Sequence, residues 1–449
     1  MIRRSTAVAR AVAIAALGAV VLAPASVASA APADDGFWYF DVFNIQDAHD
    51  AGLTGDGVTI AVLDSQINLE VPTLEGADIQ VQDSACWDTS GELISPTSTE
   101  LTAEHGTNVV SYLVGSGAGY PGQTGVKGVV PDATIIYTMV GRDTADGLIC
   151  ESESGTDIPD AKAKGVYAAI DAGADIISVS LGGGVDASFL VAVALAIHEG
   201  IVVISSVSND LMAAGSQGNF PGNGNGVIGV QSIDANAVIQ GSSEEDFDSV
   251  ANASTDVVGP GVNVVWQGGS TWEEQRYATG TSIATPIVAG FLGLVAQKYP
   301  DATGNQLIQT LLLNTGGEDH ELNYDTEYGY GAASATHMLR NDPTGYDDVN
   351  LAISDDPNDA PSAAMIANPP TLEEYLAGSE TGTAADGADD GDTDGGQAGP
   401  DEPSEGLPVL PIILGAVALL VVIGLIILIV VMTSRRSRST STPPRSGQA

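Results

Sequence analysis

The chain has 449 residues, of which 44% are hydrophobic and 16% are charged, so it holds enough apolar side chains to build a large core. Its 14 Lys and Arg stand against 58 Asp and Glu, which gives a formal net charge of −44. A surface this acidic repels phosphate backbones, and we therefore expect no nucleic-acid partner.

The first 30 residues have the layout of a secretory signal peptide. Three arginines are followed by an apolar run that is too short to span a bilayer. The segment ends at Ala28-Ser29-Ala30, whose small residues suit a signal peptidase. We expect residues 1–30 to direct export and residues 31–52 to form a short N-terminal extension.

Residues 53–340 alternate short apolar runs with stretches of helical periodicity. Apolar runs of this kind fit strands that are buried on both faces of a parallel sheet. The alternation predicts an α/β fold with a central, mostly parallel sheet. The expected strands are 58–64, 133–140, 176–180, 201–205 and 227–233, and the expected helices are 160–172, 187–199 and 282–298.

Two titratable side chains stand out against this pattern. Asp64 closes the first buried strand, at the carboxyl end where open α/β sheets place their sites, and a charge so near a core calls for a partner. Among the five histidines, His105 differs because it opens a helical pattern with Gly106 directly behind it. Such a histidine can present its ring to a cleft and act as a base that the carboxylate orients.

A serine and an asparagine complete the set of candidates. Ser282 follows Gly280 at the start of a helix, where the peptide dipole favours a developing oxyanion. On position alone, a simple helix cap is the commoner reading of this serine. Asn209 follows an apolar strand, and its amide is placed either to donate to an oxyanion or to form a turn.

Together these four residues resemble the subtilisin-like serine proteases, the subtilases, in which the catalytic groups follow the chain order Asp, His, Ser. The resemblance covers roughly residues 53–340. It implies a three-layer subtilisin-like fold and an endopeptidase that hydrolyses peptide bonds through an acyl-enzyme. The matching stretches are 57–64, 105–107, 128–133, 180–182, 208–209, 280–286 and the closing Tyr328-Gly329-Tyr330-Gly331.

The resemblance assigns a role to each residue. Asp64 would orient His105, and His105 would take the proton of Ser282 as that hydroxyl attacks the scissile carbonyl. Asn209 and the backbone N–H of Ser282 would form the oxyanion hole.

Substrate would lie along one further segment. Ser180, Leu181 and Gly182 would pair with an extended protein or peptide substrate and form part of its side-chain pocket. Two departures from the family pattern bear on this cleft. Gln66 stands where glycine is usual, which predicts a narrower cleft, and Ser208 replaces the glycine before Asn209, which predicts a shifted oxyanion amide.

The two cysteines are Cys86 and Cys150, both in the segment expected to be exported. Outside the cytosol a disulfide is the favoured reading, with two free thiols as the alternative. A zinc site is weaker because neither cysteine has a nearby histidine partner. We expect no cofactor and no metal centre, although the sequence does not decide whether calcium is needed.

The C-terminal part changes character. Residues 341–406 are acidic and rich in small residues, which predicts a disordered linker. Residues 408–432 carry no charge and are long enough to span a bilayer, and residues 433–449 form a basic tail. The positive-inside rule puts that tail in the cytoplasm, so we expect a single-pass protein of the cell membrane with its large domain outside.

This layout of extension, domain, linker and single helix is similar to that of the mycosins, membrane-anchored subtilases associated with type VII secretion. The stretch 31–52 is too short for a folded inhibitory prodomain, and its aromatic run at 37–40 is expected to pack on the domain instead. An alternative function is therefore a docking component among the membrane proteins of a secretion complex. A third reading, an acidic ectodomain that binds calcium or the cell wall, is weaker because the acids are spread.

Overall fold

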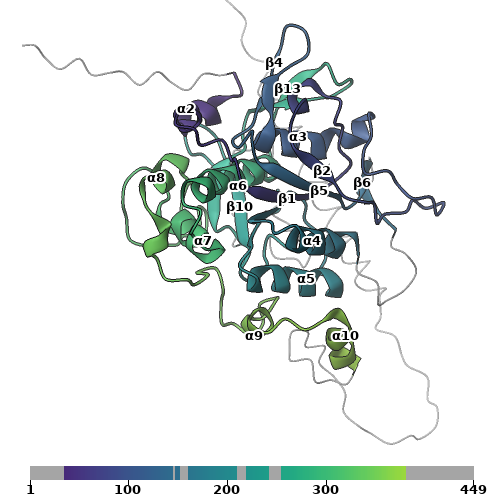
Figure 1. Cartoon of the computed structure of the whole chain (residues 1–449), viewed down its shortest axis with the longest axis vertical. Helices are drawn as coiled ribbons and strands as arrows, with labels where there is room; N and C mark the ends of the chain where they lie inside the picture. The colour runs from purple at the N-terminus through teal and green to yellow at the C-terminus, as the bar shows by residue number, and fades with distance from the viewer. Residues whose placement is uncertain (1–34, 145–146, 152–159, 210–218, 242–253, 381–449) are drawn as a thin grey trace, which may run out of the picture. The chain divides into compact units, whose positions relative to one another are not determined.

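The computed structural model describes residues 35–144, 147–151, 160–209, 219–241 and 254–380. Its centre is a seven-stranded sheet in the order β11-β10-β9-β8-β1-β5-β2, and every neighbouring pair runs parallel (Figure 1). The strands are β1 (Thr59–Asp64), β2 (Ile79–Val81), β5 (Thr134–Met139), β8 (Ile176–Val179), β9 (Val202–Ser206), β10 (Ile228–Ile233) and β11 (Val257–Pro260).

Helices cover both faces of this sheet. They are α3 (Glu104–Val114), α4 (Ala161–Asp171), α5 (Ala187–His198), α6 (Thr281–Lys298) and α7 (Gly304–Leu313). Successive strand residues point to opposite faces, and β1 shows the result. Ile60 and Val62 join the core beneath α3 and α6, whereas Ala61 and Leu63 join the core beneath α4 and α5.

The predicted elements are confirmed to within two residues at each end. The expected strands correspond to β1, β5, β8, β9 and β10, and the expected helices to α4, α5 and α6. Local capping fixes several of the starts: the Asp160 side chain accepts from the N–H of Ala163, and Asp186 accepts from Ser188 and Phe189. The α/β class with a central parallel sheet is therefore confirmed.

Three antiparallel hairpins lie outside the main sheet. They are formed by β3 (Ser116–Ala118) with β4 (Thr124–Lys127), β6 (Arg142–Thr144) with β7 (Gly147–Ile149), and β12 (Val264–Gln267) with β13 (Gln275–Ala278). The third hairpin contacts α3 and ends four residues before Ser282. It therefore connects the histidine-bearing helix with the serine-bearing one.

The aromatic run of the N-terminal extension packs on the domain as expected. It forms α1 (Trp38–Val42) and continues into α2 (Ile45–Asp50), and the side chains of Trp38, Tyr39 and Phe40 are buried. The Tyr39 hydroxyl donates to the Lys127 carbonyl at 2.6 Å. Burial, together with the charge of Asp35, raises the pKa of Tyr39 far above its usual range, so the phenol stays neutral.

The prediction of a disordered linker from residue 341 was wrong for its first forty residues. After α8 (Ala335–Arg340), the chain forms α9 (Ala363–Ala367) and α10 (Leu372–Glu380), both packed on α5. Ile366 is buried in the core beneath α5, and the buried Asn350 amide donates to the Gly226 carbonyl at 2.9 Å. Residues 341–380 are acidic overall, but a few of their side chains are buried against the domain, and these contacts hold the segment in place.

The predicted disulfide is confirmed. Cys86 and Cys150 are bonded, with their Cα atoms 4.6 Å apart, and their neighbours Trp87 and Glu151 exchange backbone hydrogen bonds. The predicted signal peptide, the rest of the linker, the segment 408–432 and the basic tail lie outside the described residues. Across 35–380, no helix of the described part combines the length and apolarity needed to cross a membrane.

Candidate active site

Asp64 and His105 meet at the carboxyl end of β1. The first is the last residue of the strand, the second lies in the first turn of α3, and His105 Nδ1 is 2.7 Å from Asp64 Oδ1. The carboxylate is fully buried, whereas 23% of the imidazole side chain is exposed. This contact leaves the other ring nitrogen, Nε2, for a partner in the cleft.

The Asp64 carboxylate is held from behind. The Ser65 N–H donates to Oδ1 at 2.7 Å, and among the described residues Oδ2 is buried with no hydrogen-bond partner. A carboxylate with so few donors gains most from the imidazole that faces it. Tyr137, whose hydroxyl donates to the Ser65 carbonyl at 2.6 Å, fixes the turn that carries this arrangement.

The pKa of His105 is raised above its ordinary value. Burial acts to lower it, but the Asp64 carboxylate opposes this through its charge and hydrogen bond, with smaller contributions from Asp143 and Glu104. The protonated ring is thus stabilised at the position where a proton would arrive from a serine.

Ser282 stands in the first turn of α6, two residues after the N-cap Gly280. Its carbonyl accepts a hydrogen bond from the Ser180 hydroxyl at 3.1 Å, which joins the helix start to the end of β8. A Cβ on Gly280 would lie 3.4 Å from Ser282 Oγ and 3.9 Å from both side-chain polar atoms of Asn209. The missing side chain therefore leaves hydroxyl and amide facing each other.

The Asn209 amide has a defined orientation. Its Oδ1 accepts from the Thr281 N–H at 3.0 Å, from the Thr281 hydroxyl at 3.2 Å and from Gln240 Nε2 at 2.6 Å. Because these donors occupy the carbonyl side, Nδ2 is the end left to donate. Gln240 is itself fixed by the Ser232 hydroxyl, which donates to its Oε1 at 2.7 Å.

These groups share one cleft of about 370 Å³. Its lining includes the predicted residues His105, Ser180, Leu181, Gly182, Asn209 and Ser282. The segment that follows Gly182 is fixed along one edge, since Gly183 exchanges two backbone hydrogen bonds with Phe220 at 3.0 and 3.1 Å. The structure thus gathers every predicted site residue except Asp64 on the cleft wall, with Asp64 buried behind His105.

The two residues that depart from the family pattern, Gln66 and Ser208, lie in different places relative to the cleft. The Gln66 side chain is buried, donates to the Ser95 carbonyl at 2.8 Å and accepts from the Thr102 hydroxyl at 2.7 Å. It does not line the cleft, so the expectation of a narrower cleft was wrong: the side chain fastens a neighbouring loop instead. Ser208 does line the cleft, beside Asn209.

Sequence reasoning missed three residues of this site. Thr281 and Gln240 orient Asn209, and the buried Asn219 lines the cleft with an amide nitrogen that has no hydrogen-bond partner among the described residues. Gln240 carries no sequence signal, because it lies 31 positions from its partner. Within the described part of the chain, no three His, Cys, Asp or Glu side chains group in a way that could hold a metal ion.

Comparison with known proteins agrees with this geometry. The subtilase family pattern matches residues 55–331. A thermostable alkaline protease of Halalkalibacterium halodurans is 30% identical over 280 residues, which are 61% of this chain and 66% of that protein. Subtilisin Savinase of Lederbergia lenta is 31% identical over 300 residues, which are 65% of this chain and 94% of that protein.

A solved structure supports the fold. Fervidolysin from Fervidobacterium pennivorans, described as a keratinolytic enzyme related to subtilisin, superposes with a TM-score of 0.52 at 24% identity, over 70% of this chain and 47% of that one. The family match spans more than half of the chain, and it includes Asp64, His105, Asn209 and Ser282. The chain therefore belongs to the subtilase family of subtilisin-like serine proteases.

Proposed function

We propose that this protein is a serine endopeptidase that uses Asp64, His105 and Ser282 as its catalytic triad. The observation that carries the proposal is the buried carboxylate 2.7 Å from Nδ1 of an imidazole that lines the same cleft as Ser282. A serine hydroxyl is a weak nucleophile at neutral pH, and a base oriented in this way is what activates it.

The reaction follows from the placement of the groups. His105 takes the Ser282 proton while Oγ attacks the scissile carbonyl, and Asp64 stabilises the imidazolium that forms. Asn209 Nδ2 and the Ser282 N–H, in the first turn of α6, donate to the oxyanion. His105 then protonates the leaving amine, and water releases the acyl group by the same path.

The substrate is a protein or peptide in extended form. Ser180, Leu181 and Gly182 line the cleft, and Gly183, the next residue, is paired with Phe220. A substrate strand placed against it would bring its scissile carbonyl between Ser282 and Asn209. Asn219 lines the same cleft, and its amide nitrogen, which has no hydrogen-bond partner among the described residues, suits a substrate group that offers an acceptor oxygen.

We also propose that the enzyme is exported and anchored in the cell membrane by residues 408–432, with its catalytic domain outside and its C-terminus in the cytoplasm. The support is the uncharged run of 25 residues and the four arginines after it. The mycosin-like layout extends this to a role beside the membrane proteins of a secretion complex. Protease protection of a C-terminal tag in spheroplasts tests the orientation.

Labelling by a serine-directed fluorophosphonate tests the catalytic assignment. Wild type is expected to be labelled and to cleave a peptide library, whereas Ser282→Ala and His105→Ala each lose about 10⁴–10⁶-fold in turnover. The double variant is expected to be little worse than either, because triad members act as a unit.

Asn209→Ala is the graded control, with a loss of about 10²–10³-fold, the range seen for one oxyanion donor in a subtilisin. Unchanged cleavage by purified Ser282→Ala protein would refute the assignment. If the protein served only as a docking part, cells carrying Ser282→Ala would secrete normally while deletion of residues 31–406 would stop secretion.

A further inference from the structure

One stripe of helix α3 is fastened to strand β12. Glu104, Asn108 and Tyr112 lie at intervals of four residues and therefore share a face of the helix. The Tyr112 hydroxyl donates to the Val265 carbonyl at 2.6 Å. Asn108 donates to the Gln267 carbonyl at 2.7 Å and accepts from its N–H at 2.8 Å. His105 is thus carried on a helix that is tied to this strand on every turn.

The contact between α3 and the hairpin that lies nearest to His105 is made by Glu104, the preceding residue. Glu104 Oε1 accepts from Arg276 at 2.6 Å and from the indole N–H of Trp266. Gly268, at φ +116°, allows the backbone to close over this carboxylate, since a Cβ there would lie 2.7 Å from Glu104 Cδ. A single carboxylate oxygen thereby holds both strands of the hairpin.

Trp266 in turn contacts the histidine. Its ring centroid is 5.9 Å from that of His105, with the planes tilted by 57°, and only 6% of its surface is exposed. Arg276 is its cross-strand partner and lies 5.5 Å from the same ring. The imidazole is therefore in contact with both the Asp64 carboxylate and the Trp266 indole.

We propose that Glu104 is a positioning residue for the His105 base, acting through Trp266 and Arg276. By fixing the indole against the imidazole, it limits the movement of the ring away from Ser282. By holding Arg276 in β13, it also ties the helix that carries the base to the strand that leads to the nucleophile. This inference rests on the proposed peptidase function.

The charges around the imidazole mean that the pKa of His105 can be measured as a second effect of changing Glu104. Asp64 from β1, Asp143 from β6 and Glu104 from α3 all favour the protonated ring, while Arg276 from β13 is paired with Glu104. Removing the Glu104 charge should lower the pKa of His105, so the neutral base would persist at lower pH. The shift in pKa reports the Glu104 charge, whereas recovery of kcat in Glu104→Gln reports the positioning.

The test compares Glu104→Ala, Glu104→Gln and the control Glu75→Ala in the purified full chain. Glu75 is an exposed glutamate that lines no part of the cleft. We expect Glu104→Ala to lower kcat by about 10–100-fold and to change KM less than about threefold, because a small misplacement of a reacting group is this costly. Glu104→Gln keeps an acceptor for Trp266 and should recover most of kcat.

In both Glu104 variants the acid limb of kcat/KM is expected to move to lower pH, whereas Glu75→Ala should match wild type. Trp266→Phe, which keeps a ring but loses the N–H, provides a milder variant with an expected loss of about 3–10-fold in kcat, should Glu104→Ala unfold. The inference is overturned if the kcat and acid limb of Glu104→Ala equal those of Glu75→Ala, or if Glu104→Gln is as impaired as Glu104→Ala. An inactive wild type would overturn the proposed function, and the inference with it.

Discussion

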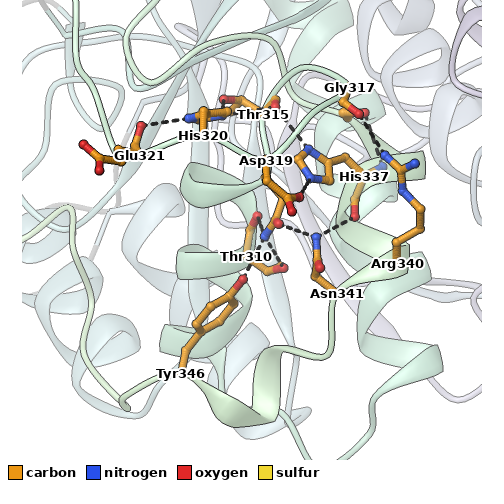
Figure 2. Close-up of polar contacts among 12 residues, drawn as sticks. Thr310, Thr315, Gly317, Asp319, His320, Glu321, His337, Arg340, Asn341 and Tyr346 are labelled. Carbon is orange, nitrogen blue, oxygen red and sulfur yellow. Dashed lines mark hydrogen bonds and ion pairs between the residues drawn. The ribbon is translucent and has the colours of Figure 1, made fainter.

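In the described part of the chain, two histidines each contact an aspartate, and the burial of the two partners is reversed between the pairs. At the cleft, the Asp64 carboxylate is fully buried and the His105 side chain is 23% exposed. In α8, the His337 side chain is 1% exposed, and its partner Asp319, in the preceding loop, is 94% exposed. Figure 2 shows the pair. The N···O distances are similar, at 2.7 and 2.9 Å. Distance alone therefore does not distinguish a catalytic base from a histidine that only stabilises the fold.

The second ring nitrogen separates the two. His337 Nε2 faces Asp319 Oδ1 while Nδ1 faces the Thr315 carbonyl at 3.2 Å, so both nitrogens are already engaged. Figure 2 shows this ring joining the loop at 315–320 to α8, with Arg340 reaching the Gly317 carbonyl at 2.9 Å. His105 has one nitrogen held and one directed to a cleft. A histidine can exchange protons with a substrate only in the second arrangement.

The largest expected difference is in turnover. Asp64→Asn should lower kcat by about 10³–10⁴-fold, because an amide permits the wrong tautomer of His105. Asp319→Asn should leave kcat within about twofold, since its partner lies outside the cleft. Hydrolysis of a fluorogenic peptide measures both. A variant Asp64→Asn with more than a tenth of wild-type activity would remove the basis of the contrast.

Stability should separate the two histidines far less than turnover does. His337→Ala removes one of the two ring nitrogens that face the buried Thr315 carbonyl and opens a cavity, so we expect the free energy of unfolding to fall by about 2–3 kcal/mol. His105→Ala leaves the fully buried Asp64 carboxylate without the imidazole, so it should also lower the free energy of unfolding, by about 1–3 kcal/mol. Urea unfolding monitored by tryptophan fluorescence gives both values. A His337→Ala variant as stable as wild type would show that this histidine does not stabilise the fold.

The smallest effect is in pH dependence. Because the pKa of His105 is raised in the folded chain, activity that needs the neutral ring should decline as pH falls through that raised value. The stability that the same group contributes runs the other way. It is fully present below the unfolded value of about 6.5 and is lost as pH rises through the folded pKa.

Salt sharpens this pH prediction. The more distant charges, Asp143 and Glu104, are screened more than the contact with Asp64, since the Debye length at 0.15 M is about 8 Å. The acid limb should therefore move to slightly lower pH as salt is added, without losing all of its shift. Paired pH–rate profiles at low and moderate ionic strength measure this. An acid limb that does not move with salt would show that the distant carboxylates contribute nothing.

The strands and the four main site residues were predictable because they depend on local patterns. The buried run that ends at Asp64 and the glycine beside Ser282 are short-range signals. Gln240 and Trp266 were not predictable, since each acts on a residue that is far away in sequence. The apolar anchors after residue 341 were missed for a related reason: Ile366 lies in a short apolar run, Ala363–Ala367, which packs on the distant helix α5. The roles of the site residues stay predictions until the variants are measured.

The packing of residues 341–380 on α5 limits how far the catalytic domain could lie from the proposed membrane anchor. If the whole stretch 341–406 were a tether, its 66 residues would reach at most about 230 Å from the membrane anchor. With the segment through α10 bound to the domain, 26 residues are left, and their limit is about 90 Å. With the anchor proposed at 408–432, this limit would keep the cleft close to the bilayer, and substrates that emerge from the same membrane would meet it at a higher effective concentration.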